Sequence, residues 1–172
     1  MFSFFSQVKV KRVLFTGLVL VLLAGFSGGC KNEVADDSTT GLLSALLGKW
    51  VADFGDSYEI TSSGGTETLK TSYDGTTVAS QGTIRAVTNF NSSSGVIIVE
   101  YSSGHTNPNR PFGAVYYLNR TSKTVSFNSA WDGTAADYDA NTATLEQAIA
   151  KFTQAGMGNY VDVSYAVPYT KQ

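Results

Sequence analysis

The chain has 172 residues, with 12 Lys and Arg against 14 Asp and Glu, a formal net charge of −2, one Cys and one His. The slight excess of acid argues against a nucleic-acid-binding protein, because phosphates require clustered Lys and Arg. A single cysteine excludes an internal disulfide, so stability must come from a hydrophobic core, for which the chain is long enough.

The chain begins with a segment typical of a secretory signal peptide. Lys9, Lys11 and Arg12 precede an apolar run over residues 13–26, and small residues follow at 27–29. Cations, a short apolar core and small residues in this order are the pattern of an exported leader. The apolar run has 14 residues, whereas a helix needs about 20 to span a bilayer, so we expect removal of residues 1–29 rather than a membrane helix.

The single cysteine, Cys30, directly follows this leader. The stretch Phe26-Ser27-Gly28-Gly29-Cys30 resembles a bacterial lipobox, in the relaxed form of spirochaete lipoproteins. The resemblance implies cleavage before Cys30, fatty acyl chains such as palmitate on its thiol, and usually a further chain on the new amine. The alternative is an ordinary secretory signal with a chance cysteine, but a lone exported thiol invites intermolecular disulfides. We therefore expect a lipid anchor in a membrane, since two or more acyl chains hold a protein firmly.

Lys31 stands where Asp would retain a lipoprotein in the inner membrane, and this resemblance to the known sorting rule favours the outer membrane of the cell envelope. The mature chain would have 143 residues and a net charge of −5, because three cations and none of the acids leave with the leader. Such a surface does not favour electrostatic binding to a membrane, so the lipid itself would hold the protein there.

Residues 30–40 are polar and acidic without periodicity, which predicts a flexible tether between the lipid and a single domain over residues 41–172. Residues 41–48 are largely apolar but too few for an independent helix. We expect them to form one or two helical turns that plug the end of a core. A second membrane contact is the alternative for this segment.

From residue 49 onward, apolar and polar residues alternate with the period of two that is typical of β-strands. Turn formers stand at Gly64-Gly65 and Asp74-Gly75, and Gly82 within a long strand predicts a bulge or a bend. The stretch VIIVEY at 96–101 is largely apolar on both faces, which favours a central strand. A last strand is expected near the C-terminus, with an apolar face made of Val161, Val163, Tyr165 and Val167.

One segment departs from the strand period. Thr144 and Gln147 fit a capping box, in which each side chain satisfies a free backbone N–H group at a helix start. Apolar residues then recur at helical spacing, at Leu145, Ala148, Ile149 and Phe152. A helix of about three turns with one apolar stripe cannot stand alone, so we expect it to lie against the sheet.

About seven strands, a helix and a closing strand predict an all-β fold with minor α content, an antiparallel up-and-down barrel of eight strands with one helix before the last strand. This layout resembles the lipocalin and calycin group, in which a Gly-x-Trp triplet opens the first strand, as Gly48-Lys49-Trp50 does here. The closing Arg of that group has no counterpart, so we expect the partner stacked on Trp50 to be missing or replaced. The alternation places a set of bulky side chains in the barrel interior: Trp50, Phe54, Ile60, Phe127, Trp131 and Tyr165.

The sequence offers no catalytic or metal-binding constellation, and we expect no cofactor. His105 stands alone among turn formers, which favours an exposed loop histidine. Asp132, Asp137 and Asp139 could together offer oxygens to Ca²⁺, but their spacing favours a solvated acidic loop. A set of tyrosines fits cross-strand packing better than a binding surface: Tyr101, Tyr116, Tyr117, Tyr160, Tyr165 and Tyr169.

These features predict a non-enzymatic, lipid-anchored barrel that binds either a small apolar ligand inside or a partner protein at its surface. The bulky interior set favours a filled barrel, since eight strands enclose room for their own side chains or for one small ligand. An enzyme is the alternative of a different class, and it would require two groups among Arg85, Glu100, Asp132 and His105 to meet in one cleft. A structural surface lipoprotein is the third possibility.

Overall fold

The structure is a computed structural model of the whole chain, and it describes residues 43–104, 107–135 and 139–172, apart from the side chain of Tyr165. The predicted leader, the lipidation site Cys30 and the predicted tether lie outside the described residues, as do His105 and Asp137. Among the described residues, we find no helix with the length and apolar character that a membrane crossing requires.

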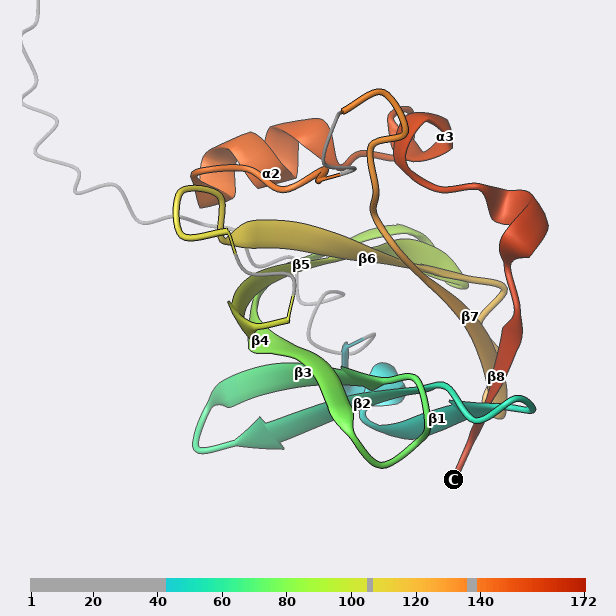
Figure 1. Cartoon of the computed structure of the whole chain (residues 1–172). Coiled ribbons are helices and arrows are strands. Elements are labelled where there is room, and N and C mark those ends of the chain that lie inside the picture. Colours follow the sequence, from blue (N-terminus) through green and yellow to red (C-terminus); the bar gives the residue numbers. More distant parts are fainter. Residues whose placement is uncertain (1–42, 105–106, 136–138) are drawn as a thin grey trace, which may run out of the picture. The chain divides into compact units, whose positions relative to one another are not determined.

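Eight antiparallel strands form a closed barrel, in which each strand pairs with the next along the chain and the last pairs with the first (Figure 1). The strands are β1 (Gly48–Ala52), β2 (Ser57–Ser63), β3 (Thr66–Ser72), β4 (Val78–Asn91), β5 (Ser94–Ser103), β6 (Phe112–Leu118), β7 (Thr124–Ser129) and β8 (Pro168–Lys171). The prediction of an all-β fold with an up-and-down, eight-stranded barrel is confirmed.

Turn formers define the strand boundaries where the sequence predicts them. Gly64 and Gly65 form the β2–β3 turn with φ of 61° and 79°, a left-handed conformation that Gly adopts without strain. The predicted bulge in the long strand β4 is also present, because the register between β4 and β5 shifts between Gln81 and Gly82.

Two apolar clusters lie on opposite faces of the barrel wall. The buried residues of the inner cluster are Leu46, Trp50, Ala52, Tyr58, Ile60, Leu69, Ile84, Val87, Ile97, Val99, Tyr101, Val115, Tyr117, Val125, Phe127 and Tyr169. Those of the outer cluster are Val96, Ile98, Ala114, Tyr116, Ala140, Ala148, Phe152 and Val161. β5 contributes Ile97 and Val99 to the inner cluster and Val96 and Ile98 to the outer one, so it is buried on both faces as its sequence predicts.

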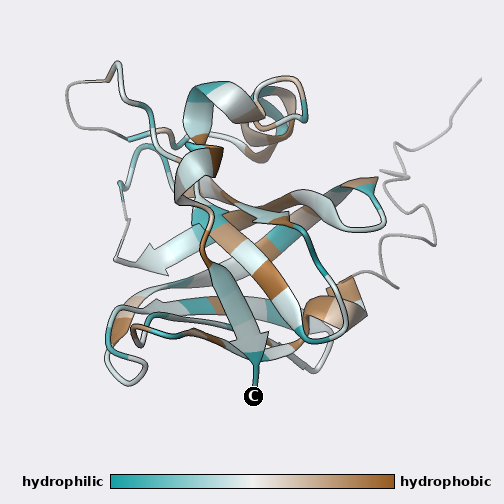
Figure 2. Ribbon diagram, turned by 90° about the vertical axis from the view of Figure 1, so that its right-hand side faces the viewer, coloured by the Kyte–Doolittle hydropathy of each residue, from teal (hydrophilic) through white to brown (hydrophobic). Residues whose placement is uncertain are grey.

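The helix α2 (Leu145–Lys151) covers the outer cluster and begins with the predicted capping box. The Thr144 hydroxyl accepts a hydrogen bond from the Gln147 N–H at 3.3 Å, and Gln147 Oε1 accepts one from the Ala143 N–H at 3.2 Å. Leu145, Ala148 and Phe152 pack into the outer cluster, so α2 lies against the outside of β5 and β6 (Figures 1 and 2). Ile149, the fourth member of the expected apolar stripe, is exposed. The short helix α3 (Met157–Tyr160) follows it.

The structure places part of the predicted interior set elsewhere. Three of its members lie in the inner cluster: Trp50, Ile60 and Phe127. The prediction is wrong for Phe54 and Trp131, whose side chains are 59% and 46% exposed. β1 ends at Ala52 and β7 ends at Ser129, so both aromatic residues lie beyond a strand end, where the alternation between two faces no longer applies.

The last strand also begins later than the sequence predicts. Val163–Tyr165 form a 3₁₀ turn instead, in which the Asp162 carboxylate accepts a hydrogen bond from the Ser164 N–H at 2.9 Å. β8 starts at Pro168, which has no N–H to donate and is tolerated at the first position of a strand. Tyr165 therefore does not occupy an inward strand position, and its side chain lies outside the described part of the structure.

Candidate functional site at the loop end of the barrel

The up-and-down topology gives the barrel two unlike ends. The loop end carries the β1–β2, β3–β4 and β5–β6 connections and the segment that follows β7. The plug end carries the β2–β3, β4–β5 and β6–β7 turns and the helical turn of residues 43–46. Figure 2 shows this helical turn and the loops at opposite sides of the barrel.

Apolar side chains close the plug end. Leu46 is fully buried, and Leu43 and Leu47 pack beside it against the inner cluster. The indole N–H of Trp50 donates a hydrogen bond to the backbone oxygen of Leu46 at 2.7 Å, which fastens the helical turn to β1. The structure thus contains the predicted helical plug at one end of the core.

Lys171 is the residue that stacks on Trp50. Its Nζ lies 5.2 Å from the centroid of the Trp50 ring, within the range of a cation–π contact. The Lys171 stem passes so close to Gly48 that an added Cβ would lie 3.1 Å from Lys171 Cε, and Gly48 also has a φ of 118°. Both observations explain why the strand opens with glycine.

Towards the loop end, hydroxyl-bearing side chains enter the barrel interior. The hydroxyls of Tyr58 and Ser129 lie 3.2 Å apart, and that of Tyr101 is also hydrogen-bonded to Ser129. The buried hydroxyls of Thr71 and Ser80 lie 2.7 Å apart, at positions that the register places level with Tyr58. These five side chains, from β2, β3, β4, β5 and β7, are called the hydroxyl layer below.

Burial raises the pKa of both phenols in the hydroxyl layer. For Tyr101, removal from water disfavours the phenolate and the nearby Tyr58 adds to this effect, while the hydrogen bond to Ser129 opposes it. For Tyr58, burial again dominates over the opposing hydrogen bond to Ser129. Both phenols therefore stay protonated at neutral pH, so they can orient a polar group by hydrogen bonding but cannot act as bases.

Aromatic rings fill the barrel next to the hydroxyl layer. Tyr58 stacks on Phe127 with ring centroids 4.8 Å apart, and Tyr169 meets these two rings edge-on at 5.2 and 5.9 Å. Trp50 contacts Phe127 at 6.2 Å. These contacts join β1, β2, β7 and β8, so side chains occupy the interior at this level.

Exposed apolar side chains stand around the loop end. Phe54 lies in the β1–β2 turn, Tyr73 lies in the β3–β4 turn and is 68% exposed, and Val78 begins β4. Trp131 follows β7, and Val163 lies in the 3₁₀ turn before β8. These five residues are called the rim below. Ile149, another exposed apolar residue, lies away from the rim on α2.

The period-two pattern does not identify the rim, but turn signals mark part of it. Phe54 directly precedes turn formers at 55–56, and Tyr73 precedes turn formers at 74–75. An aromatic residue within a turn signal is more readily exposed than one within a strand. No comparable signal marks the hydroxyl layer, because Ser and Thr alternate along outward-facing positions of this sheet as well.

The residues considered for an enzyme occupy separate places. Arg85 and Glu100 form an ion pair at 2.6 Å on the outer face of the barrel, with side chains 48% and 35% exposed. The Asp132 carboxylate accepts hydrogen bonds from the Thr134 hydroxyl and N–H in an exposed turn, and these bonds lower its pKa. His105, the fourth candidate, lies outside the described residues.

The aspartates considered as ligands of Ca²⁺ also have separate partners where the structure describes them. Asp139 accepts a hydrogen bond from the Asn141 N–H at 2.7 Å and pairs with Arg110 at 3.1 Å. Asp132 belongs to its own turn, and Asp137 lies outside the described residues. Within the described ranges, no group of three or more His, Cys, Asp or Glu residues could hold a metal ion.

Most of the tyrosines in the later strands are packed rather than displayed. Four of them are buried: Tyr101, Tyr116, Tyr117 and Tyr169. The Tyr117 hydroxyl lies inside the barrel and donates to Asn89 Oδ1 at 2.5 Å, and burial raises the pKa of Tyr117 to about 12. These contacts agree with the expected cross-strand packing.

The fold and the two ends define the class of the protein, an eight-stranded antiparallel β-barrel of lipocalin-like architecture. Comparisons with protein-family models, with curated proteins and with solved structures gave no match. The interpretation of its function therefore depends on the geometry of the barrel itself.

Proposed function

We propose that the protein is a non-enzymatic binding module of the cell envelope, anchored in the outer membrane by lipid on Cys30, and that its rim recognises a partner protein. The observation that carries this proposal is the gathering of exposed aromatic and aliphatic side chains at one end of a barrel whose interior is occupied by its own rings. A filled barrel of this kind serves as a rigid support for its loops.

The composition of the rim supports a protein partner. Three of its members are aromatic: Phe54, Tyr73 and Trp131. Aromatic residues are enriched at the centres of protein interfaces and supply much of their binding energy. Single exposed apolar residues are normal on any surface, but a set placed on the connections and one strand start at the same end of a barrel indicates an interaction surface.

A small apolar ligand at the loop end is the second candidate, and the hydroxyl layer is the observation that favours it. Tyr101 and Ser129 could hydrogen-bond the polar group of such a ligand, while the rim contacted its apolar part. Native mass spectrometry of the protein released from its own host membrane distinguishes the two candidates. A small molecule that remains bound would favour the ligand-binding function. A spectrum of the protein without any bound small molecule would favour the protein partner.

The anchor is tested separately from the rim. We expect mass spectrometry of the membrane-extracted protein to show a mature chain that begins at Cys30 and carries acyl chains. The variant Cys30→Ala should leave the membrane fraction, because it has no thiol to acylate. A wild-type protein that is recovered in aqueous fractions with a free thiol would contradict the anchor.

Site-specific crosslinking tests the rim. A photoreactive phenylalanine analogue at position 73, introduced in host cells, should yield one adduct of defined mass with another protein. The double variant Phe54→Ser/Trp131→Ser should reduce the yield of this adduct at least tenfold, which corresponds to about 1.4 kcal/mol of binding energy. Ile149→Ser is the matched control, because it removes an exposed apolar side chain from α2 and not from the rim.

Circular dichroism of the double variant should show an intact barrel, since neither side chain is buried. An adduct that forms equally with the double variant, or that is lost equally with Ile149→Ser, would rule out the rim as the recognition surface.

A further inference from the structure

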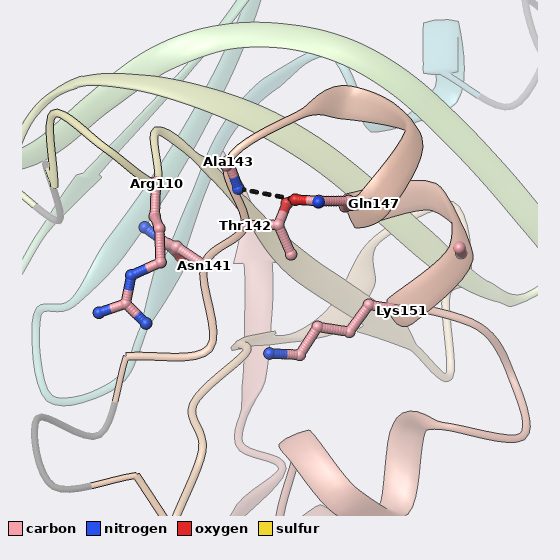
Figure 3. Close-up of a pocket in the computed structure, with 7 residues that line it drawn as sticks. Arg110, Asn141, Thr142, Ala143, Gln147 and Lys151 are labelled. Carbon is pink, nitrogen blue, oxygen red and sulfur yellow. Dashed lines mark hydrogen bonds between the residues drawn. The ribbon is translucent and has the colours of Figure 1, made fainter.

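A second surface feature lies outside the barrel, where α2 meets the segment that precedes it and the β5–β6 connection. It is a pocket of about 540 Å³, open to solvent, on the opposite side of the barrel wall from the inner cluster (Figure 3). Its lining includes Arg110, Asn141, Ala143, Gln147, Ala150 and Lys151. The proposed function does not use this pocket, and the rim residues do not line it.

Two cationic side chains reach the pocket from different elements. Arg110 comes from the β5–β6 connection and Lys151 from the last turn of α2, and Figure 3 shows both extending towards the same side of the pocket. The Arg110 guanidinium is oriented by Asp139, at 3.1 Å. Lys151 Nζ donates to the backbone oxygen of Ala140 at 2.6 Å and lies 4.8 Å from the centroid of the Tyr160 ring.

The carboxylates near these cations accept hydrogen bonds from other groups of the protein. Both oxygens of Asp139 accept hydrogen bonds from the surrounding backbone and side chains, from the Asn141 N–H at 2.7 Å and the Asn107 amide at 3.4 Å, in addition to its pairing with Arg110. Asp132 lies within electrostatic range of Lys151, but its carboxylate is hydrogen-bonded by Thr134 in its own turn. No carboxylate lines the pocket, but the Asp139 carboxylate is paired with Arg110, so Lys151 supplies the positive charge that this ion pair does not balance.

The remaining walls combine three polar residues, Asn141, Thr142 and Gln147, with the methyl groups of two alanines. Gln147 Oε1 is engaged by the Ala143 N–H at 3.2 Å, which fixes the side-chain amide so that its NH₂ group is the part left to donate (Figure 3). Ala143 and Ala150 contribute methyl groups, and the stems of Arg110 and Lys151 are apolar as well. Cations above a methyl-lined wall suit an anion with a short apolar body.

We propose that this pocket binds a small organic carboxylate. The planar guanidinium of Arg110, held by Asp139, matches the two oxygens of a carboxylate, and Lys151 supplies positive charge on the same side of the pocket. The methyl groups of Ala143 and Ala150 accommodate a few carbon atoms of the ligand. An inorganic anion would use the cations alone and would gain nothing from these methyl groups.

Titration of the full-length protein in detergent micelles with pentanoate tests the proposal. Pentanamide is the uncharged analogue, and inorganic phosphate is an anion without a hydrocarbon chain. We expect pentanoate to bind with a Kd of about 1–10 mM in low salt, as two partly exposed charge contacts permit. Pentanamide and phosphate should each bind at least tenfold more weakly. Chemical shifts of the Ala143 and Ala150 methyl groups report binding at this place.

Three variants decide whether these residues form the site. Lys151→Gln should weaken pentanoate binding at least tenfold, and Ala150→Met should do the same by filling the pocket while leaving both cations in place. Ala150 is exposed on α2, so this variant is expected to fold even if Lys151→Gln loosens the segment at Ala140. Lys123→Gln removes a distant exposed cation at the plug end and should leave the Kd unchanged.

Equal binding of pentanoate and pentanamide would overturn the proposal, as would unchanged affinity in Ala150→Met. Phosphate binding as tight as that of pentanoate would overturn the assignment to carboxylates. None of these results bears on the rim, since Phe54, Tyr73 and Trp131 lie outside α2 and do not line the pocket.

Discussion

The plug end and the loop end of the barrel differ in where they place apolar and polar groups. At the plug end, Leu46 and Trp50 are fully buried, and the cation of Lys171 lies outside them. At the loop end the order is reversed, because the hydroxyls of Tyr58 and Tyr101 lie inside while aromatic side chains such as Tyr73 are exposed.

This difference indicates which end of the barrel serves stability and which end serves interaction with another molecule. Burial of apolar surface is the main source of stability, and a structure selected for stability alone keeps such residues inside. The plug end follows this rule except for one internal hydrogen bond, from the Tyr117 hydroxyl to Asn89. The loop end departs from it on both sides of the barrel wall, which is expected where a surface meets another molecule.

The two tryptophans of the chain give the largest test of the comparison. Trp50→Ala should reduce the free energy of unfolding by about 3–5 kcal/mol, because it leaves a cavity and removes the hydrogen bond to Leu46. Trp131→Ala should change it by about 0.5 kcal/mol or less, as is usual for an exposed side chain. Urea unfolding followed by circular dichroism measures both, and similar losses in the two variants would remove the distinction between the ends.

The buried phenol of Tyr101 gives the next largest effect. Tyr101→Phe removes the hydroxyl bonded to Ser129 and should cost about 1 kcal/mol of stability at neutral pH. Burial raises the pKa of Tyr101 above its value in the unfolded chain, so its stabilising contribution is complete below pH ~10 and is lost as the pH rises further. Above that pH, this residue alone should lower the stability of the wild type by up to about 1.4 kcal/mol per pH unit.

The variant has no phenol to ionise at position 101, so its stability should decrease less steeply. The two unfolding free energies should therefore converge between pH 9 and about pH 11. Tyr73→Phe is the matched control, because Tyr73 is exposed at the same end, and it should change stability at neutral pH by about 0.5 kcal/mol or less. A constant difference between wild type and Tyr101→Phe across this range would contradict the burial of the phenol in the hydroxyl layer.

Much of the barrel could be predicted from the sequence because local signals and tertiary structure agree there. The period-two alternation, the turn at Gly64-Gly65 and the capping box at Thr144 each act within a few residues. The run of four apolar residues at 96–99 also predicts burial on both faces, since a strand that is apolar on both faces is covered on both. Strand order then follows from short connections.

The loop end could not be predicted in the same way, because it depends on where each strand stops. Phe54 and Trp131 continue the alternation of β1 and β7 by sequence, yet both strands end two residues earlier and the side chains become exposed. The hydroxyl layer joins residues as distant as Tyr58 and Ser129. Contacts at that separation depend on barrel closure, which alternation alone does not specify.

Substitution of Lys171, at the plug end, should give the smallest change in the free energy of unfolding. Lys171→Met keeps the stem that crosses Gly48 but removes the charge over the Trp50 ring, and it should cost about 0.5–1 kcal/mol, the range of an exposed cation–π contact. Lys171→Arg should retain the wild-type stability, because the guanidinium also binds the face of an indole. Lys123→Met, an exposed lysine in the neighbouring β6–β7 turn, is the matched control. If Lys171→Met and Lys123→Met have equal midpoints in urea, the cation does not help to close this end, and the apolar plug alone would account for its stability.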